Sequence, residues 1–253
     1  MKIGVVGLGL IGGSIFRDLN ALQKYEVIGI SQSQKGENIT NDYICLKTCD
    51  IVFVCKPMNK TLSVLDELNG ILPKNTIVTD VCSLKRFVSN KKYNFNFIPS
   101  HPMAGTEKQG FENSFEGLFK GAKWVITPIN SSDNTEILES IVKDLGAIPV
   151  YTTPDKHDKA VALISHLPMV ISQALFKNAA DNNLALNIAS SGFRDTTRLA
   201  MSNVEMAQDM VTMNADNIEE TLLSLYRVLG ELLSPSYKDE ITKIKSQREK
   251  MFK

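Results

Sequence analysis

The sequence has little of what marks several large classes of protein. Its four cysteines include no CxxC pair, which argues against a disulfide framework and predicts reduced thiols with no bound metal. Basic and acidic residues number 28 each, so we expect neither nucleic acid nor a membrane surface as a partner. No apolar run reaches the roughly 18 residues of a membrane span, and the first apolar run follows Met1 too closely for a signal peptide. These absences predict a cytoplasmic protein.

A glycine-rich turn lies near the N-terminus. The apolar run 3–6 has the character of a buried strand and leads into Gly-Leu-Gly-Leu-Ile-Gly at 7–12, a GxGxxG pattern. In such a turn the first glycine permits the bend, the second admits a pyrophosphate, and the third lets the next helix pack on the strand. The apolar spacing of 11–22 predicts that helix, and 27–30 predicts a second strand. We therefore predict a dinucleotide site at the helix N-terminus.

The residue after the second predicted strand bears on which dinucleotide is bound. An acidic residue about 20 positions beyond the glycines holds the ribose 2′-hydroxyl of NAD in many such folds. This chain has Ser31 there, with Lys35 nearby. A small hydroxyl and a cation could accept a 2′-phosphate, and Ser31 could equally tolerate NAD. The predicted cofactor is therefore NAD or NADP.

Strands and helices alternate through the first 150 residues, which predicts an α/β fold with a mostly parallel sheet covered on both faces. After 151 the strand pattern stops and helices follow, among them a long apolar helix over 160–180 that we expect to be buried and kinked near Pro168. We predict a Rossmann-type domain over 1–153 and an all-α domain over 154–253. The second has more apolar surface than one chain can cover, which predicts a homodimer. The predicted strands are 51–55, 77–79, 97–100, 124–127 and 148–151, and the helices between them are 61–68 and 135–145.

Several polar segments each follow a predicted strand. In open parallel sheets, ligands bind beyond the carboxyl ends of the strands, so these segments should meet in one crevice. The predicted cofactor-binding residues are Gly7, Leu8, Gly9, Leu10, Ile11, Gly12, Ser31, Lys56, Pro57 and Asp80.

Three histidines occur in the whole chain. His101 follows a predicted strand at the place where the nicotinamide end of a cofactor would lie. An imidazole there can accept the proton of a substrate hydroxyl as hydride leaves, and Ser83 could add a hydrogen bond. His157 and His166 lie at the start of the helical half, where a surface or core role is an equal alternative for His157.

A polar stretch at 190–198, predicted as a loop between apolar helices, holds two arginines. A guanidinium binds a carboxylate through two parallel hydrogen bonds, so Arg194 and Arg198 suit a carboxylate substrate. They could instead pair with Asp195 and cap a helix. The spacing alone leaves both interpretations open.

Five motifs together resemble the prephenate/arogenate dehydrogenase family of tyrosine biosynthesis, over nearly the whole chain. They are GLGLIGGS at 7–14, DVCSLK at 80–85, HPMAGTE at 101–107, SHLP at 165–168 and GFRDTTR at 192–198. The resemblance implies oxidative decarboxylation of prephenate to 4-hydroxyphenylpyruvate, or of arogenate to tyrosine, in a dimer whose active site lies between the two domains.

The resemblance also assigns roles by motif position. His101 is the catalytic hydrogen-bond acceptor and Ser83 its partner, and Arg198 binds a substrate carboxylate across the pocket from His101. Glu107 pairs with an arginine at the pocket mouth. The residues implied to line or support the pocket are Thr106, His157, His166 and Asp195.

Two positions depart from the family pattern. Many prephenate-using members have a second histidine directly after the SHLP motif, and this chain has Met169; the acidic residue expected at 31 is also absent. The substrate and the cofactor therefore each keep two candidates. Two other function classes remain open: a β-hydroxyacid dehydrogenase, which should carry a catalytic lysine in the helical half, and a non-catalytic dinucleotide sensor.

Overall fold

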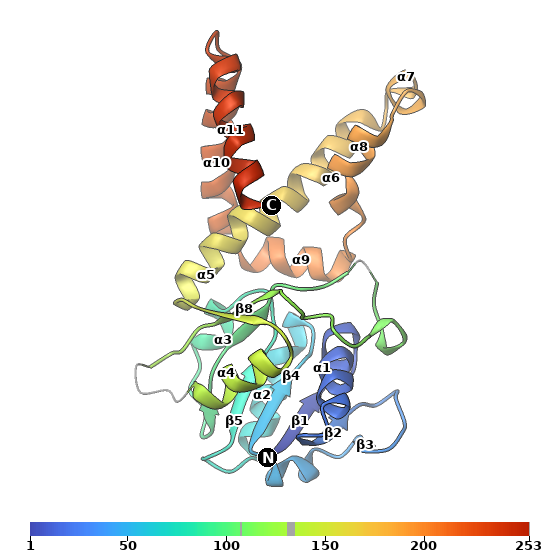
Figure 1. Ribbon diagram of the computed structural model, residues 1–253, viewed down its shortest axis with the longest axis vertical. Coiled ribbons are helices and arrows are strands. Elements are labelled where there is room, and N and C mark those ends of the chain that lie inside the picture. The colour runs from blue at the N-terminus through green and yellow to red at the C-terminus, as the bar shows by residue number, and fades with distance from the viewer. Residues whose placement is uncertain (107, 131–134, 253) are drawn as a thin grey trace.

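The computed structural model describes residues 1–106, 108–130 and 135–252. It has a sheet-containing lower part built from the first 151 residues and a helical upper part built from the rest (Figure 1). The last strand ends at Tyr151, and the first helix of the upper part begins at Pro154, with the Thr153 hydroxyl accepting a hydrogen bond from Lys156 N. The chain thus changes from α/β to all-α within three residues.

A parallel sheet of six strands organises the lower part, in the order β3-β2-β1-β4-β5-β6. This confirms the predicted Rossmann-type sheet. The two central strands are buried along nearly their whole length because helices cover both faces. The strands are β1 (Lys2–Val6), β2 (Glu26–Ile30), β3 (Ile39–Thr40), β4 (Ile51–Val54), β5 (Ile77–Asp80) and β6 (Asn96–Phe97).

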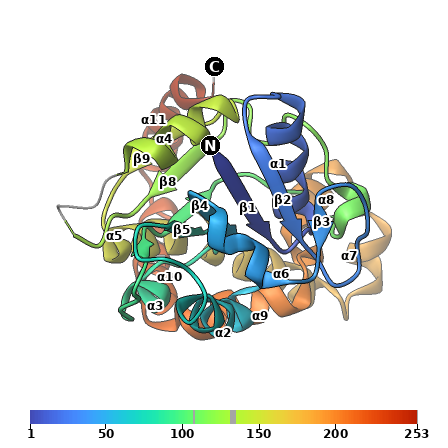
Figure 2. The same ribbon diagram turned by 90° about the horizontal axis from the view of Figure 1, so that it is seen from below.

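Alternate side chains of each central strand enter two different hydrophobic cores. Ile51 and Phe53 pack toward α1 (Leu10–Ala21) and α4 (Glu136–Asp144). Val52 and Val54 pack toward α2 (Met58–Asn69) and α3 (Arg86–Ser89), on the opposite face (Figure 2). The period of two along an extended chain requires this division. Two 3₁₀ turns, η1 (Tyr43–Thr48) and η2 (Phe111–Asn113), complete the connections.

A second sheet of three strands was not predicted. The single strand expected over 97–100 is two strands: β6 ends at Phe97 in the large sheet, and β7 (Ser100–Pro102) pairs antiparallel with β8 (Lys123–Ile126). Pro99 lies at the break and has no N–H to continue the first ladder. Its carbonyl accepts from Thr127 N at 2.9 Å. Strand β9 (Ile148–Tyr151) then pairs parallel with β8.

The first helical stretch of the upper part is irregular. Helix α5 (Pro154–Val161), the π-helical turn η3 (Ala162–His166) and α6 (Leu167–Ala179) follow one another without a break. The irregularity lies one turn before Pro168, close to the predicted kink. The expectation that this stretch is buried was wrong in part, because Leu163 and Ile164 are 60% and 64% exposed.

Most of the remaining helices belong to two arms that rise from the lower part, and one helix lies across the base of the arms (Figure 1). The stretch 190–198, predicted as a loop, is mostly helical: Arg194 N donates to Ser190 O at 3.0 Å and Thr197 N to Phe193 O at 2.9 Å. Gly192 therefore does not interrupt the helix. The elements are α7 (Asn183–Asn187), α8 (Ser191–Thr196), the 3₁₀ turn η4 (Arg198–Met201), α9 (Val204–Met213), α10 (Ala215–Leu232) and α11 (Tyr237–Met251).

One helical stretch among the described residues, Pro154–Ala179, is long and apolar enough to cross a membrane by length and composition alone. Core helices of water-soluble domains meet the same two criteria. This stretch also carries four buried polar side chains, and three of them, those of His157, Asp158 and His166, make hydrogen bonds inside the protein; the fourth is Ser172.

Candidate active site

The glycine turn between β1 and α1 depends on the absence of side chains at two positions. Gly7 has a φ of +94°, and a Cβ there would lie 2.4 Å from the carbonyl oxygen of Cys55. A Cβ on Gly12 would lie 2.0 Å from the carbonyl oxygen of Gly7. Gly9 differs, since no described atom lies within 4 Å of the place its Cβ would take. The turn is thus closed at its ends and open at its middle, where a ligand backbone or phosphate can approach.

The N-terminus of α1 faces this opening. No side chain caps its N-terminal amides, and its first turn holds no acidic residue. Uncapped amides and the helix dipole favour an anion there, so the residues present fit a pyrophosphate. Of the apolar residues of the turn, Leu8 is buried in the core beneath, whereas Leu10 and Ile11 are half-buried.

The sequence pattern did not identify Gly13 as part of this turn. A Cβ on Gly13 would lie 2.7 Å from Ser114 Oγ and 2.8 Å from the Phe111 ring, so the helix also packs tightly against η2. The doubled glycine at 12–13 is the signal that could have indicated this contact.

Ser31 is buried at the end of β2, and its side chain already has partners. Its Oγ accepts from Gln34 N at 3.0 Å and from Ser33 N at 3.3 Å, which closes the turn after the strand. Lys35 on the same turn is exposed. The ribose end of the predicted site thus presents a hydroxyl used within the turn and a cation at the surface.

Lys56 and Pro57 follow β4, one strand away from the glycine turn. The Lys56 side chain passes beside Gly7, with Cδ 3.1 Å from the position a Cβ would take. Pro57 is the residue before α2, whose N-terminus has no side-chain cap. Both residues lie where the sequence analysis expects cofactor contacts.

Asp80 needs a correction. The sequence predicted a cofactor contact, but its carboxylate is fully buried and its partners are inside the protein. It forms an ion pair with Lys85, accepts from Cys82 N at 2.9 Å and accepts from Ser100 N at 3.3 Å. A carboxylate sealed in this way binds the loop after β5 to β7, and it cannot reach a bound ribose.

Three side chains from two domains form a hydrogen-bonded chain that ends at His101. His101 Nδ1 lies 3.0 Å from His157 Nε2, and His157 Nδ1 lies 2.7 Å from Asp158 Oδ1. Asp158 also accepts from the backbone N–H groups of Lys85 and Arg86, at 2.8 and 2.9 Å. The carboxylate on α5 is therefore fixed to the start of α3.

These contacts determine the protonation state of each ring nitrogen. Because Asp158 is an acceptor for two backbone N–H groups, His157 Nδ1 must donate to it, and neutral His157 then accepts at Nε2. His101 Nδ1 therefore donates to His157. The free Nε2 of His101 keeps a lone pair, which can accept a hydrogen bond or a proton.

The surroundings keep His101 neutral. Burial is the largest cause that holds the pKa of His101 well below its usual range, and the nearby Lys85 cation acts in the same direction. A neutral imidazole with an available lone pair is the form that a proton acceptor requires.

His166 lies at the other end of the same polar region. The side-chain amide nitrogen of Asn214 donates to the backbone carbonyl of Asp158 at 2.9 Å and lies 3.2 Å from His166 Nδ1. The side-chain amide nitrogen of Asn217 donates to Asn214 Oδ1 at 2.7 Å. His166 is fully buried, which lowers its pKa to about 4, and no described residue forms a hydrogen bond with its Nε2. The sequence gave no signal for Asn214, because its partners Asp158 and His166 are 56 and 48 residues away.

The other predicted site residues have fewer contacts with the protein. Ser83 is half-buried, and its hydroxyl has only a weak contact with Met58 Sδ, at 4.0 Å. Thr106 is exposed and accepts from Lys108 N at 3.2 Å. Glu107 lies outside the described residues. The Ser83 hydroxyl is therefore available to a ligand.

Asp195 lies on α8 and Arg198 begins η4, both in the helical part. Asp195 pairs with Arg194 at 3.1 Å, and both are well exposed. Arg198 is also exposed, and in the described part of the chain its side chain has no hydrogen bond or ion pair. Its neighbour Leu199 packs on an apolar cluster between the two domains, which places Arg198 beside that interface.

This apolar cluster covers the site from above. Met169, where many relatives have histidine, is one of its buried members. An apolar side chain there adds no polar contact to a ligand. The buried members are Met58, Cys82, Leu84, Val161, Met169, Ala207 and Met210.

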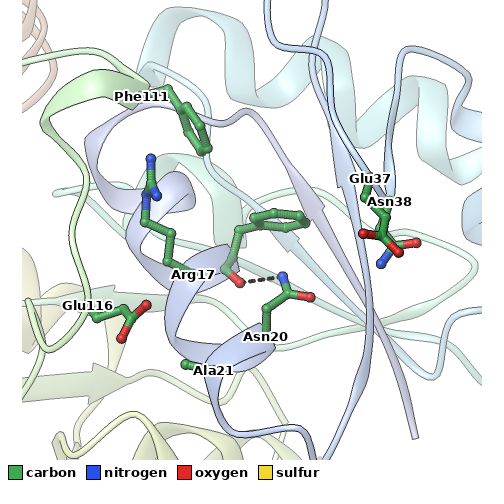
Figure 3. A pocket seen from close by; sticks show the side chains of 8 residues that line it. Arg17, Asn20, Ala21, Glu37, Asn38, Phe111 and Glu116 are labelled. Atoms are coloured by element: carbon green, nitrogen blue, oxygen red, sulfur yellow. Dashed lines mark hydrogen bonds between the residues drawn. The ribbon is translucent and has the colours of Figure 1, made fainter.

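Two surface pockets lie away from the His101 region. One of about 320 Å³ lies on the outer side of α1, where the Arg17 guanidinium extends toward Phe111, with Glu37 and Asn38 on its far side (Figure 3). Another of about 340 Å³ includes Thr106 and Phe115. Neither includes a histidine, so we place the candidate site on the hydrogen-bonded chain and the glycine turn.

Comparison with known families identifies both domains of the chain. The model of the prephenate dehydrogenase nucleotide-binding domain matches residues 23–151, and that of the prephenate dehydrogenase dimerization domain matches 153–247. The chain belongs to the prephenate dehydrogenase family. A β-hydroxyacid dehydrogenase is thereby set aside.

Members of this family similar to the chain differ in substrate. Prephenate dehydrogenase of Bacillus subtilis is 30% identical over 85% of this chain, which spans 64% of that protein. Cyclohexadienyl dehydrogenase of Zymomonas mobilis is 27% identical over 84% of this chain and 80% of its own length. The structure of Synechocystis arogenate dehydrogenase is 35% identical, with a TM-score of 0.86 over 99% of this chain and 100% of that one.

The two kinds of glycine in the turn give a matched test. Gly12→Ala should lower the free energy of unfolding by about 3 kcal/mol, because its methyl group overlaps a backbone carbonyl. Gly9→Ala should unfold within about 0.5 kcal/mol of the parent, yet raise the Kd for NAD(P) by about tenfold or more, because the methyl occupies the open approach. Urea denaturation and calorimetric titration measure both; equal behaviour of the two variants would contradict the assignment.

Proposed function

We propose that this chain is an NAD(P)-dependent dehydrogenase that converts prephenate to 4-hydroxyphenylpyruvate by oxidative decarboxylation. The observation that carries the proposal is the Asp158–His157–His101 chain, because His101 lies on β7, which Ser100 and Asp80 tie to the end of β5 in the parallel sheet. Family membership supports the same reaction class.

The residues of the chain supply proton transfer and orientation. His101 Nε2 accepts the proton of the ring hydroxyl as the hydroxyl-bearing carbon is oxidised, and the negative charge of Asp158 stabilises the resulting positive charge through His157. Ser83 donates a hydrogen bond to the same oxygen. The Gly7–Gly12 turn and Lys56 would hold the dinucleotide, whose nicotinamide supplies the hydride acceptor when bound. Loss of the ring carboxylate as CO₂ then gives an aromatic product.

Arg198 is our candidate for the residue that binds a substrate carboxylate. It is a cation beside the domain interface, and it has no ion pair with any described residue. Thr106 and Asp195 stay proposals for the pocket rim. Prephenate is the first candidate, because the similar enzyme of Bacillus subtilis is a prephenate dehydrogenase.

Arogenate is the second candidate, favoured by the likeness to the Synechocystis enzyme over almost the whole chain. For the cofactor, we propose that NADP is accepted at least as well as NAD. Position 31 has no carboxylate to hold a 2′-hydroxyl or to repel a 2′-phosphate, and Lys35 adds a nearby cation.

We further propose that the helical domain forms a homodimer. Its arms expose large apolar side chains that one chain leaves uncovered, including Ile188, Tyr226 and Leu233, each at least 72% exposed. The matching family model describes this region as a dimerization domain.

Initial rates for the four pairings of prephenate or arogenate with NAD or NADP test the reaction directly. We expect the highest kcat/KM with prephenate, and a value with NADP no lower than with NAD. A tenfold preference for arogenate would replace the proposed substrate. No NAD(P)H formed in any pairing would favour the sensor class instead.

Two single variants should separate proton transfer from substrate binding. His101→Asn should lower kcat by about 10²–10⁴-fold with little change in cofactor Kd, since it removes the proton acceptor. Arg198→Ala should mainly raise the substrate KM, since a carboxylate contact stabilises the bound substrate and the transition state alike. In the parent, kcat/KM should fall as pH drops through the lowered pKa of His101, below the usual 6.5. An unchanged kcat in His101→Asn would remove its role.

The dimer can be tested by charge placed on the exposed arm. Leu223→Glu combined with Tyr226→Glu, both on α10 and 60% and 75% exposed, should convert a dimer to a monomer in sedimentation velocity. Ile44→Glu is a matched control on the sheet domain, at 53% exposed, and should stay dimeric. A monomeric parent protein would contradict the proposal.

A further inference from the structure

Lys85 is a charged side chain with no exposed surface and no part in the proposed reaction. Burying an ammonium group is costly unless it is paired and hydrogen-bonded. Its Nζ forms an ion pair with Asp80 and donates to the carbonyl oxygen of Ser100 at 2.6 Å. The second contact is the informative one, because that carbonyl belongs to the peptide group that leads into His101.

Ser100 is held through every polar group it has. Its N–H donates to Asp80 Oδ1 at 3.3 Å, and its hydroxyl donates to the Asp80 carbonyl at 2.9 Å. Trp124 Nε1 donates to the same hydroxyl at 3.0 Å, and Thr79 Oγ1 lies 2.8 Å from it. The Asp80–Lys85 pair therefore fixes both backbone sides of the residue before His101.

The backbone of Lys85 acts on the imidazole from the other direction. Its N–H donates to Asp158 Oδ1 at 2.8 Å, the same oxygen that His157 Nδ1 contacts. His157 in turn holds His101 Nδ1. One residue thus contacts the peptide group that carries His101 and the carboxylate that orients the partner of its ring.

We propose that Lys85 is a positioning residue for His101. Its ammonium group fixes Ser100, the residue before His101, and its backbone N–H fixes Asp158, the partner of His157. The inference deepens the proposed function and rests on His101 being the proton acceptor. It also explains why the chain keeps a buried ion pair where apolar side chains could fill the same space.

The charge of Lys85 also affects His101, because it favours the neutral form of the imidazole. The titratable groups that face His101 are His157 from α5, His166 from η3 and Lys85 itself, while the carboxylates of Asp158 and Asp80 are engaged by their own donors. Removing the Lys85 cation removes one cause that disfavours imidazolium. The pKa of His101 should then rise.

The test uses Lys85→Met in the full-length protein, together with the double variant Asp80→Asn, Lys85→Met, which leaves no unpaired buried charge if the single variant fails to fold. We expect kcat to fall by about 10- to 100-fold while the Kd for NAD(P) stays within twofold. The acid limb of the kcat/KM profile should move to higher pH by about 0.5 to 1 unit.

Val142→Ala is the matched control, a core truncation in α4 at a fully buried position remote from the chain of histidines. It should lower Tm without moving the acid limb. If the Lys85 variants behave like Val142→Ala, with kcat within twofold and the limb unmoved, the positioning role is overturned.

A titration by NMR separates this inference from the proposed function. With only three histidines, the ¹³Cε1–¹H signal of His101 can be assigned from its loss in His101→Asn. A rise in the pKa of His101 in the Lys85 variants supports the positioning role even if no substrate is turned over. An unchanged His101 titration in a protein that oxidises prephenate overturns the role and leaves the function intact.

Discussion

The carboxylate of Asp158 is the point on which the site depends. It accepts hydrogen bonds from two successive backbone amides at the start of α3 and from His157, so a single buried anion joins the helical domain to the sheet domain. Backbone donors are fixed by the fold and cannot rotate away, which makes them dependable partners for a buried charge. Together with the apolar cluster between the domains, this contact fixes how the helical domain meets the sheet domain, and it orients the His157 ring that holds His101.

The two sheets position different parts of the site. The parallel sheet ends at the glycine turn, where close packing at Gly7 and Gly12 leaves an opening at Gly9. The small sheet carries His101 on β7, and Pro99 is where the chain leaves one sheet for the other. Because β7 is tied to the end of β5 through Ser100 and Asp80, the nucleotide end and the histidine end of the site keep a fixed separation.

The helical domain has a different character from the sheet domain. Its first helix contributes the buried polar groups that face His101, while its arms leave large apolar side chains in contact with solvent. A monomer with this surface would lose much of the hydrophobic stabilisation that its sequence makes possible. The same domain therefore contributes polar groups to the site on one side and leaves an exposed apolar surface on the other.

The sequence by itself determined the parallel sheet, the glycine turn, the place of most elements and the family, because these depend on local periodicity and short motifs. It misplaced what depends on contacts distant in the chain. Asp80 looked like a cofactor ligand until Lys85 and Ser100 enclosed it, and 97–100 looked like one strand until Pro99 divided it between two sheets. The contact of His157 with His101, and the contacts of Asn214 behind His166, were decided by the tertiary structure alone, since the paired residues are 48 to 56 positions apart.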